Sequence, residues 1–424
     1  MNFAVSEQYL LSLGNEVSAM KLGLASMRRL LGELGDPQAK FLKIQIAGTN
    51  GKGSTCAFLD AMLRSAKLNV GLYTSPHLVS MTERIKVDGV DIDEREFARL
   101  ATRVRRASEA LVEREELDSV PTYFEQVTAI GLLAFAKAKV DVAILETGLG
   151  GRLDATTAAD AEIAAITRID LDHEKYLGRT LSKIAVEKAA IIRPHTQFAV
   201  LGEQTAKVRL QLARHCCEDD VRSIDAGATR VNVEKDGVEF TTQRATYRVK
   251  KLGLAGEHQI ENAKVAIAVA ENILSTFKNT RKNIESGLRV ARNPGRLERI
   301  GRFLLDGAHN PSGIAALADH IRKHIDAPVT TIFAAMEDKN SRVMMREYFP
   351  LARTIVLTEA ANSRSTPYQE LLEKMPDGIS KERTFATDNV ASALQVALTA
   401  DPEAVIVVAG SLYLVGEVRA RLAP

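Results

Sequence analysis

The chain has 424 residues, more than a single hydrophobic core usually serves, so we expect two domains. Lysine and arginine total 56 against 54 aspartates and glutamates, and a net charge of +2 argues against a general nucleic-acid or membrane-surface binder. The three cysteines follow no metal or disulfide spacing, and we find no signal peptide and no apolar run of about 18 residues. These features predict a reduced, cytoplasmic protein.

Short apolar segments alternate with stretches of helical periodicity through the first 295 residues. This alternation predicts an α/β domain built on a parallel sheet. Near residue 221 the pattern changes to alternating polar and apolar residues, with Asp236-Gly237 as a hairpin turn, which predicts a small antiparallel excursion over 221–255. The expected buried strands are 41–48, 69–74, 140–147 and 162–169, and the expected helices are 54–67, 124–139 and 258–274.

A break follows at Asn293-Pro294-Gly295, which interrupts a helical stretch shortly before a new apolar strand at 302–306. Further apolar strands are expected at 328–336, 353–360 and 404–410, separated by helical stretches. We therefore predict two domains, 1–295 and 296–424. The fold class is α/β: a P-loop-type parallel-sheet ATPase domain with the antiparallel excursion, and a smaller, Rossmann-like α/β domain.

The segment IQIAGTNGKGSTCAFLDAML reads as a strand, a glycine-rich turn and a helix. Its glycines allow the backbone to approach phosphate oxygens, the lysine brings a positive charge, and the helix offers its N-terminal end. The spacing differs from the common GxxxxGK[ST] motif, and the alternative is a tight turn with a solvated lysine. The residues that we predict to bind nucleotide here are Gly48, Thr49, Asn50, Gly51, Lys52, Gly53, Ser54 and Thr55.

The loop GTNGKGS at 48–54 resembles the nucleotide loop of the muramyl-ligase superfamily, especially its folylpolyglutamate synthase and dihydrofolate synthase branch. Further segments similar to that branch follow in the family's order and span nearly the whole chain. They are LGL at 22–24, YTSPHL at 73–78, TYFEQ at 122–126, ETGLGGRLDAT at 146–156, LDHEKYLG at 171–178, EKAAI at 187–191, GEHQIENA at 256–263, PGRLE at 294–298, DGAHNP at 306–311 and GSLYLVGEV at 410–418.

The resemblance implies an ATP-dependent ligase that joins L-glutamate to dihydropteroate, to (tetrahydro)folate, or to both, through an acyl phosphate. Three alternatives remain: folylpolyglutamate synthase activity alone, a related muramyl-peptide ligase, and a regulator that binds nucleotide without catalysis. The implied partners are small molecules, namely a folate or dihydropteroate, L-glutamate and ATP. We expect no nucleic-acid or membrane partner, and a monomer.

The resemblance also assigns residues to the metal site and to catalysis. Its Mg²⁺ ligands fall on Ser75, Glu146 and His173, and its CO₂-carboxylated lysine falls on Lys188. A hard ion such as Mg²⁺ prefers oxygen ligands, and Glu146 ends an apolar strand, where open parallel sheets place ligands. His173 alone would more often be structural, and Lys188 in a helix would more often be solvated. With Lys52, His173 and Lys188 form the predicted catalytic set.

The remaining assignments concern the second half of the nucleotide site and the pterin end of the substrate. For Asp306, an Asx-turn is the competing explanation, and for Asp154 it is a helix cap. The predicted ATP contacts are Asn262, Arg296 and Asp306. The predicted substrate contacts are Met20, Lys21, Leu22, Thr122, Tyr123, Phe124 and Asp154.

Overall fold

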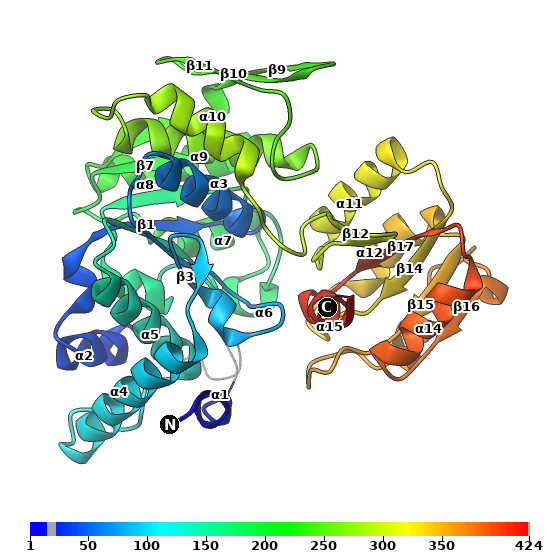
Figure 1. Ribbon diagram of the computed structural model, residues 1–424, viewed down its shortest axis with the longest axis horizontal. Helices are drawn as coiled ribbons and strands as arrows, with labels where there is room; N and C mark the ends of the chain where they lie inside the picture. Colours follow the sequence, from blue (N-terminus) through cyan, green and yellow to red (C-terminus); the bar gives the residue numbers. More distant parts are fainter. Residues whose placement is uncertain (15–22, 423–424) are drawn as a thin grey trace. The chain divides into compact units, whose positions relative to one another are not determined.

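The computed structural model describes residues 1–14 and 23–422 (Figure 1). It separates into two compact units. Two short segments that the sequence grouped with the first half, 172–176 and 254–260, belong to the second unit. The first unit comprises Met1–Leu171, Leu177–Gly253 and Glu261–Ala291, and the second comprises Asp172–Tyr176, Leu254–Ile260 and Arg292–Pro424.

The first unit is built on an eight-stranded sheet in the order β4-β3-β2-β5-β1-β6-β7-β8. The strands from β2 to β8 in this order run parallel, whereas β3 and β4 form an antiparallel edge that the sequence did not predict. The four predicted strands are present as β1, β2, β5 and β6. The bounds are β1 Leu42–Ala47, β2 Val70–Tyr73, β3 Ile85–Val87, β4 Val90–Asp91, β5 Val142–Glu146, β6 Ile163–Ile166, β7 Phe198–Leu201 and β8 Arg222–Asp225.

Helices cover the sheet, which is why its central strands are buried, although β1 also carries the polar residues Lys43 and Gln45. One core joins side chains of α1, α2, α4 and α5 to the β2–β5 side of the sheet, and another joins α7 and α8 to β6 and β7. Helix α3 packs on β1, β2 and β5, and α10 packs on α3. The bounds are α1 Phe3–Ser12, α2 Ala25–Glu33, α3 Lys52–Ser65, α4 Glu94–Glu113, α5 Tyr123–Ala138, α6 Glu174–Leu177, α7 Leu181–Ala189, α8 Ala206–Glu218, α9 His258–Ile273 and α10 Thr280–Val290.

The antiparallel excursion is shorter than the sequence predicted. It is a three-stranded sheet of β9 (Arg230–Glu234), β10 (Gly237–Thr241) and β11 (Thr246–Val249), which lies beside α10 in Figure 1. Residues 222–225, which we expected to belong to it, instead form β8 and pair in parallel with β7. Because β8 is an edge strand with mostly exposed residues, its polar composition resembles that of a hairpin.

The second unit contains a six-stranded sheet in the order β12-β13-β17-β14-β15-β16, parallel except for β12. One core joins α11, α12 and α13 to the sheet, α14 packs on β14 and β15, and α15 packs on β17. Across 1–14 and 23–422, no helix combines the length and the hydropathy needed to cross a bilayer. The bounds are β12 Glu298–Ile300, β13 Phe303–Leu305, α11 Pro311–His324, β14 Val329–Phe333, α12 Ser341–Tyr348, β15 Thr354–Leu357, α13 Tyr368–Glu373, β16 Thr384–Ala386, α14 Val390–Ala400, β17 Val405–Ala409 and α15 Leu412–Leu422.

Candidate active site

The glycine-rich loop joins the C-terminal end of β1 to the N-terminus of α3. Gly51 has φ 87° directly before the helix, and a Cβ atom there would lie 2.0 Å from Oδ1 of Asn262. Glycine is therefore required both by the backbone conformation and by the close approach of Asn262. Thr55 Oγ1 donates to the carbonyl of Asn262 at 3.4 Å. The structure thus brings Asn262, from α9, against the predicted phosphate loop.

Two lysines converge on the start of this loop. Lys52 Nζ donates to the carbonyl oxygens of Gly48 at 3.2 Å and Thr49 at 3.3 Å. Lys188, on α7, is buried, and its Nζ donates to the same Gly48 oxygen at 2.7 Å. A buried lysine at this place is not the solvated surface residue that its helical sequence context alone would suggest. Both predicted lysines therefore lie at the phosphate loop.

Ser75 and Glu146 also come together, at the C-terminal ends of the neighbouring strands β2 and β5. The backbone N–H of Ser75 donates to Glu146 Oε2 at 3.2 Å, and Glu146 is buried. The Ser75 hydroxyl is buried and has no hydrogen-bond partner among the described residues. One buried carboxylate beside an unsatisfied hydroxyl suits a hard oxygen-binding cation. No group of three His, Cys, Asp or Glu side chains with metal-binding geometry occurs in the described part of the chain.

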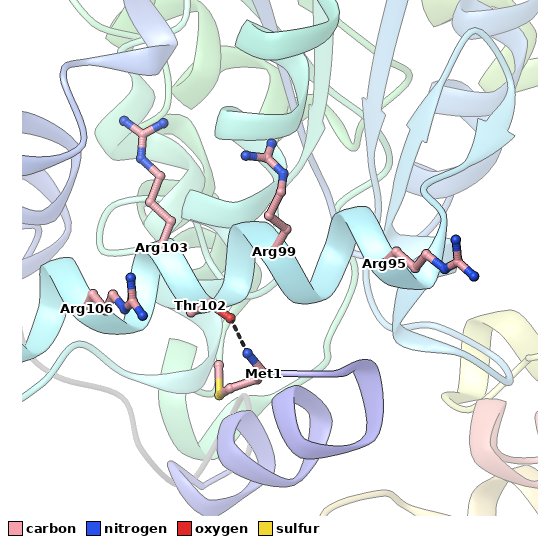
Figure 2. A pocket seen from close by; sticks show the side chains of 6 residues that line it. All are labelled: Met1, Arg95, Arg99, Thr102, Arg103 and Arg106. Atoms are coloured by element: carbon pink, nitrogen blue, oxygen red, sulfur yellow. Dashed lines mark hydrogen bonds between the residues drawn. The ribbon is translucent and has the colours of Figure 1, made fainter.

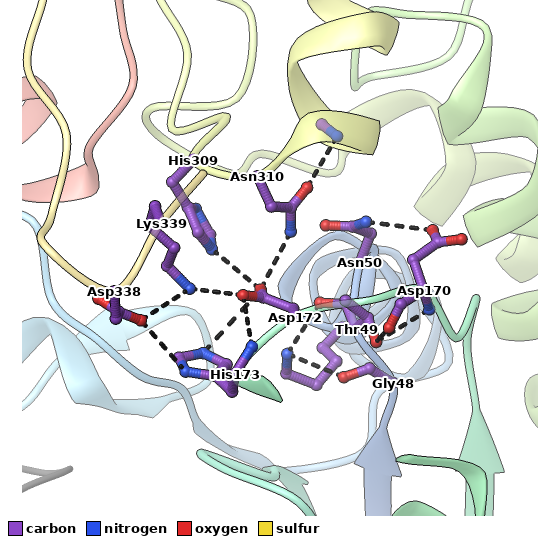
Figure 3. Close-up of polar contacts among 12 residues, drawn as sticks. Gly48, Thr49, Asn50, Asp170, Asp172, His173, His309, Asn310, Asp338 and Lys339 are labelled. Atoms are coloured by element: carbon purple, nitrogen blue, oxygen red, sulfur yellow. Dashed lines mark hydrogen bonds and ion pairs between the residues drawn. The ribbon is translucent and has the colours of Figure 1, made fainter. Parts of the chain in front are cut away.

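His173 belongs to the second unit, in a cluster of charged and polar side chains around Asp172 (Figure 3). Lys339 Nζ donates to Asp172 Oδ1 at 2.5 Å, and Asn310 Nδ2 donates to Asp172 Oδ2 at 3.1 Å. His309 Nε2 lies 3.8 Å from Asp172 Oδ2, and His173 Nδ1 lies 3.7 Å from Asp338 Oδ2. The sequence indicated only His173 here, so Asp172, Asn310 and Lys339 are additions from the structure.

Charge dominates this cluster. Burial acts to raise the pKa of Asp172, but the neighbouring His173 and Lys339 side chains hold that pKa well below its usual range. Burial first, and then Lys339, lowers the pKa of His309 to about 4, so its imidazole is neutral at pH 7. The side chains of Lys339 and Asp172 are 7% and 8% exposed, which makes theirs a buried ion pair.

Asp306, a predicted ATP contact, follows β13 and is buried. Its Oδ2 accepts from the backbone N–H of Leu297 at 2.8 Å, and its Oδ1 accepts from that of Ala308 at 2.9 Å. This is the turn-forming arrangement that the sequence left open. Arg296, the other predicted contact, lies nearby, since a Cβ atom on Gly307 would be 3.0 Å from its guanidinium. The contact of either residue with nucleotide stays a prediction.

The residues predicted to meet the pterin begin helix α5. Thr122 is the N-cap, and it forms a capping box in which its hydroxyl and Glu125 bond each other's backbone N–H groups. The ring of Tyr123 is buried below the guanidinium of Arg84, which lies 5.5 Å from the ring centroid. Phe124 packs against Gly148, where a Cβ atom would come within 2.6 Å of the ring. The TYFEQ segment and the glycine-rich segment after β5 are therefore neighbours.

Arg84 also reaches the YTSPHL segment. Its Nε donates to Nδ1 of His77 at 2.7 Å, and burial together with the Arg84 charge lowers the pKa of His77 to about 3. His77 is thus a neutral acceptor at pH 7, which fixes its tautomer with the proton on Nε2. Through Arg84, two of the predicted segments are tied together in the first unit.

Asp154 caps the 3₁₀ helix η3 (Ala155–Ala159). Its Oδ1 accepts from the N–H and the hydroxyl of Thr156 at 3.0 and 2.5 Å. Its Oδ2 accepts from the N–H groups of Gly148 and Leu149 at 3.0 and 2.9 Å. The capping role is therefore present, and the pterin contact stays a prediction. Met20, Lys21 and Leu22, the other predicted substrate contacts, lie outside the described residues.

A separate pocket lies on α4, where arginines at helical spacing share one face (Figure 2). Arg99 is bonded to Glu96, and Arg103 donates to the carbonyl of Leu34 at 3.1 Å. Arg99 and Arg103 therefore already have acceptors from the chain, and none of the predicted site residues lines the pocket. Its lining residues are Met1, Arg95, Arg99, Thr102, Arg103 and Arg106.

Comparison with known families accounts for both halves of the chain. The profile of the Mur ligase middle domain matches residues 46–270, and that of the Mur ligase glutamate ligase domain matches residues 295–412. The dihydrofolate synthase/folylpolyglutamate synthase of Bacillus subtilis is 33% identical over 417 residues, which cover 95% of each chain. The chain spans about half the length of other relatives, such as a probable bifunctional folylpolyglutamate synthase/dihydropteroate synthase of Haloferax volcanii, which is 36% identical over 94% of this chain and 48% of that protein.

Solved structures agree with these matches. The Mycobacterium tuberculosis folylpolyglutamate synthase complexed with ADP and AMPPCP superposes with a TM-score of 0.90 at 29% identity, covering 100% of this chain and 99% of that one. A bifunctional folylpolyglutamate synthase/dihydrofolate synthase with Mn, AMPPNP and L-glutamate bound gives a TM-score of 0.85 at 28% identity, covering 100% and 98%. The chain belongs to the Mur ligase family, in the branch of the dihydrofolate synthases and folylpolyglutamate synthases.

Proposed function

We propose that this protein is an ATP-dependent ligase that joins L-glutamate to dihydropteroate and to (tetrahydro)folates through an acyl phosphate. The observation that carries the proposal is the convergence of Lys52 and Lys188 on the carbonyl of Gly48, at the start of a glycine-rich loop that leads into a helix. The ammonium group of Lys52 and a helix N-terminus at one loop favour the bound phosphates of ATP. Relatives of the chain carry this activity in their names.

In this proposal the loop from Gly48 to Thr55 binds the phosphates, and Asn262 borders them at Gly51. Lys52 neutralises charge on the phosphoryl group as it moves to the substrate carboxylate, a reaction that depends on positioning and charge rather than on proton transfer. Arg296 and Asp306 remain predicted ATP contacts.

The fit of the residues to Mg²⁺ rests on Ser75 and Glu146, a free buried hydroxyl beside a buried carboxylate. They would hold the ion, with His173 as the third predicted ligand, and the ion would supply positive charge to the phosphates. A carbamate on Lys188 would place an anion next to Gly48 and direct it toward the same ion. Incubation with ¹³C-bicarbonate would reveal it as a carbamate NMR signal that Lys188→Ala lacks.

The pterin end of the substrate is proposed to lie at Thr122, Tyr123 and Phe124, opposite the loop that Asp154 closes. The ring of Phe124 is partly exposed and meets Gly148 with its edge. An aromatic face suits a flat heterocycle such as a pterin.

By domain, we propose 1–295 as the ATP-binding part and 296–424 as the glutamate-ligase part. The proposed partners are dihydropteroate or folate, L-glutamate and ATP, with the protein acting as a monomer.

The decisive experiment measures ATP- and Mg²⁺-dependent addition of ¹⁴C-glutamate to dihydropteroate and to tetrahydrofolate in parallel. Product with both acceptors supports the proposal, and product with tetrahydrofolate alone restricts it to folylpolyglutamate synthesis. ATP binding without glutamate addition to either acceptor would contradict it.

A further inference from the structure

A single amide side chain lies in the middle of the apolar strand β1. Gln45 is 1% exposed, and burying an amide is unfavourable unless its N–H groups find acceptors. Its Nε2 finds three threonine hydroxyls, at 2.7 Å (Thr157), 2.9 Å (Thr156) and 3.2 Å (Thr147). An amide nitrogen carries two hydrogens, so the two shorter bonds take one each.

These bonds have a definite direction. The Thr156 hydroxyl donates its single hydrogen to Asp154 Oδ1, at 2.5 Å, and the Thr157 hydroxyl donates its hydrogen to the carbonyl oxygen of Gly151, at 2.7 Å. Both hydroxyls must therefore accept from Gln45, which can donate from this nitrogen and cannot accept. The result is a one-way chain of hydrogen bonds from strand β1 through the threonines to the loop after β5. Bonds in such a chain polarise and strengthen one another.

The chain ends on the carboxylate that closes this loop. Asp154 accepts from the N–H groups of Gly148 and Leu149 on one oxygen and from Thr156 on the other. Burial raises the pKa of Asp154, and the four hydrogen bonds oppose that rise. Gly148 in turn lies against Phe124. Gln45 therefore connects to Asp154 through the Thr156 hydroxyl, which makes one of the four hydrogen bonds to this carboxylate.

We propose that Gln45 is a positioning residue for the pterin end of the substrate, acting through Thr156 on Asp154. The inference rests on the proposed function and goes beyond it, because the Gln45 side chain donates to Thr147, Thr156 and Thr157, none of which is a predicted nucleotide or pterin residue. Gln45 lies three residues before Gly48, so one strand supports both the phosphate loop and the pterin loop.

The test compares Gln45→Met, which removes the donor at similar volume, with Thr156→Val, which breaks the chain one step later. Both should raise KM for dihydropteroate about tenfold, while KM for ATP changes less than about twofold, since the phosphate loop is held by separate bonds. Thr156→Ser keeps the hydroxyl, so its KM for dihydropteroate should stay within about twofold of wild type.

The matched control is Thr147→Val. Thr147 is equally buried and is also a neighbour of Gln45, but at 3.2 Å, and no bond leads from its hydroxyl to Asp154 among the described residues. Its KM for dihydropteroate should stay within about twofold of wild type. A thermal melt of each variant reports on folding. If Gln45→Met does not fold, the Thr156→Val and Thr156→Ser pair carries the test.

Equal increases of KM for ATP and dihydropteroate, or a lower melting temperature with unchanged KM, would show that the network is only structural and overturn the inference. Wild-type protein that adds glutamate to neither acceptor would instead contradict the proposed function. Active wild type with unaffected variants would contradict only the role of Gln45.

Discussion

Two buried aspartates, one in each unit, are held in opposite ways. Asp154 in the first unit is surrounded by neutral donors, namely backbone N–H groups and a threonine hydroxyl, and burial raises its pKa. Asp172 in the second unit is bonded to the ammonium group of Lys339, and its pKa is held well below its usual range. Similar burial therefore does not decide in which direction the pKa of a carboxylate shifts; the charge of its partners does.

The different partners of the two carboxylates should give different energetic costs when a partner is removed. A carboxylate bound by neutral donors loses only hydrogen bonds when one donor is removed. A carboxylate bound by a buried cation is left as an uncompensated charge when that cation is removed, and this is far more costly. The two regions should therefore respond differently to salt, pH and substitution.

The largest effect on stability is expected from Lys339→Met. Removing the ammonium leaves the Asp172 carboxylate buried without its lysine partner, which should cost about 3–5 kcal/mol of unfolding free energy. Chemical denaturation of wild type and variant measures the loss. Lys339→Arg retains the charge and should lose much less. A loss below about 1 kcal/mol for Lys339→Met would show that the lysine contributes no more to Asp172 than neutral donors contribute to Asp154, which would contradict the comparison.

Lys52→Ala should have the opposite effect to Lys339→Met: it should reduce turnover strongly and leave the unfolding free energy nearly unchanged. Among the described residues, Lys52 donates to two loop carbonyls, at 3.2 and 3.3 Å, so the unfolding free energy should change by less than about 0.5 kcal/mol. Turnover should fall about 10²–10³-fold, because the substitution removes the positive charge that neutralises the transferred phosphoryl group. Lys207→Ala, at an exposed site on α8, serves as the control. Turnover within a few-fold of wild type would remove Lys52 from the proposed mechanism.

Glu146 is a further buried carboxylate, and it extends the comparison to a carboxylate whose expected partner is a metal ion. If a bound Mg²⁺ compensates its charge, Glu146→Gln should raise the Mg²⁺ concentration for half-maximal turnover about tenfold. Ser75→Ala should act in the same direction and more weakly, because a hydroxyl contributes less than a charge. Glu113→Gln, at the exposed end of α4, is the matched control. An unchanged Mg²⁺ titration for Glu146→Gln would show that it is not a ligand.

The smallest effect is a dependence of stability on pH. The pKa of His309 is about 4 in the folded protein and about 6.5 when unfolded, so the unfolded chain binds more protons between these values. Stability should therefore fall as pH drops from 6.5 toward 4. The slope is at most about 1.4 kcal/mol per pH unit, and less in practice because 26% of the side chain reaches solvent.

His77, with a pKa of about 3, should make the first unit respond in the same pH window. The two contributions separate by substitution. His309→Asn should flatten the pH dependence of unfolding in the second unit, and His77→Asn should do so in the first. Denaturation at pH 7, 6 and 5 measures both slopes. Identical slopes in wild type and His309→Asn would show that His309 is accessible to protons in the folded state.

Much of the fold followed from local patterns in the sequence. The central strands of the first sheet are mostly apolar because they are buried under helices, and the glycine loop between β1 and α3 has the composition that its backbone requires. The exceptions are short strands: β7, of four residues, lies inside the sheet and was not predicted, and the others lie at edges. Strand β8 was assigned to the antiparallel excursion, and β3 and β4 were not predicted, because short, partly exposed edge strands lack the apolar run that identifies a buried strand.

The sequence by itself determined four central strands of the first sheet, the phosphate loop and the resemblance to the ligase branch. These features depend on neighbouring residues and their order. Only the tertiary structure decided which distant side chains meet. Gln45 is a lone amide in an apolar strand until Thr156, 111 residues away, becomes its acceptor. Lys339 and Asp172 are 167 residues apart, and their ion pair was not indicated by either local pattern. Periodicity records whether a residue is buried, whereas the partner that satisfies a buried polar group is set by the packing of elements from elsewhere in the chain.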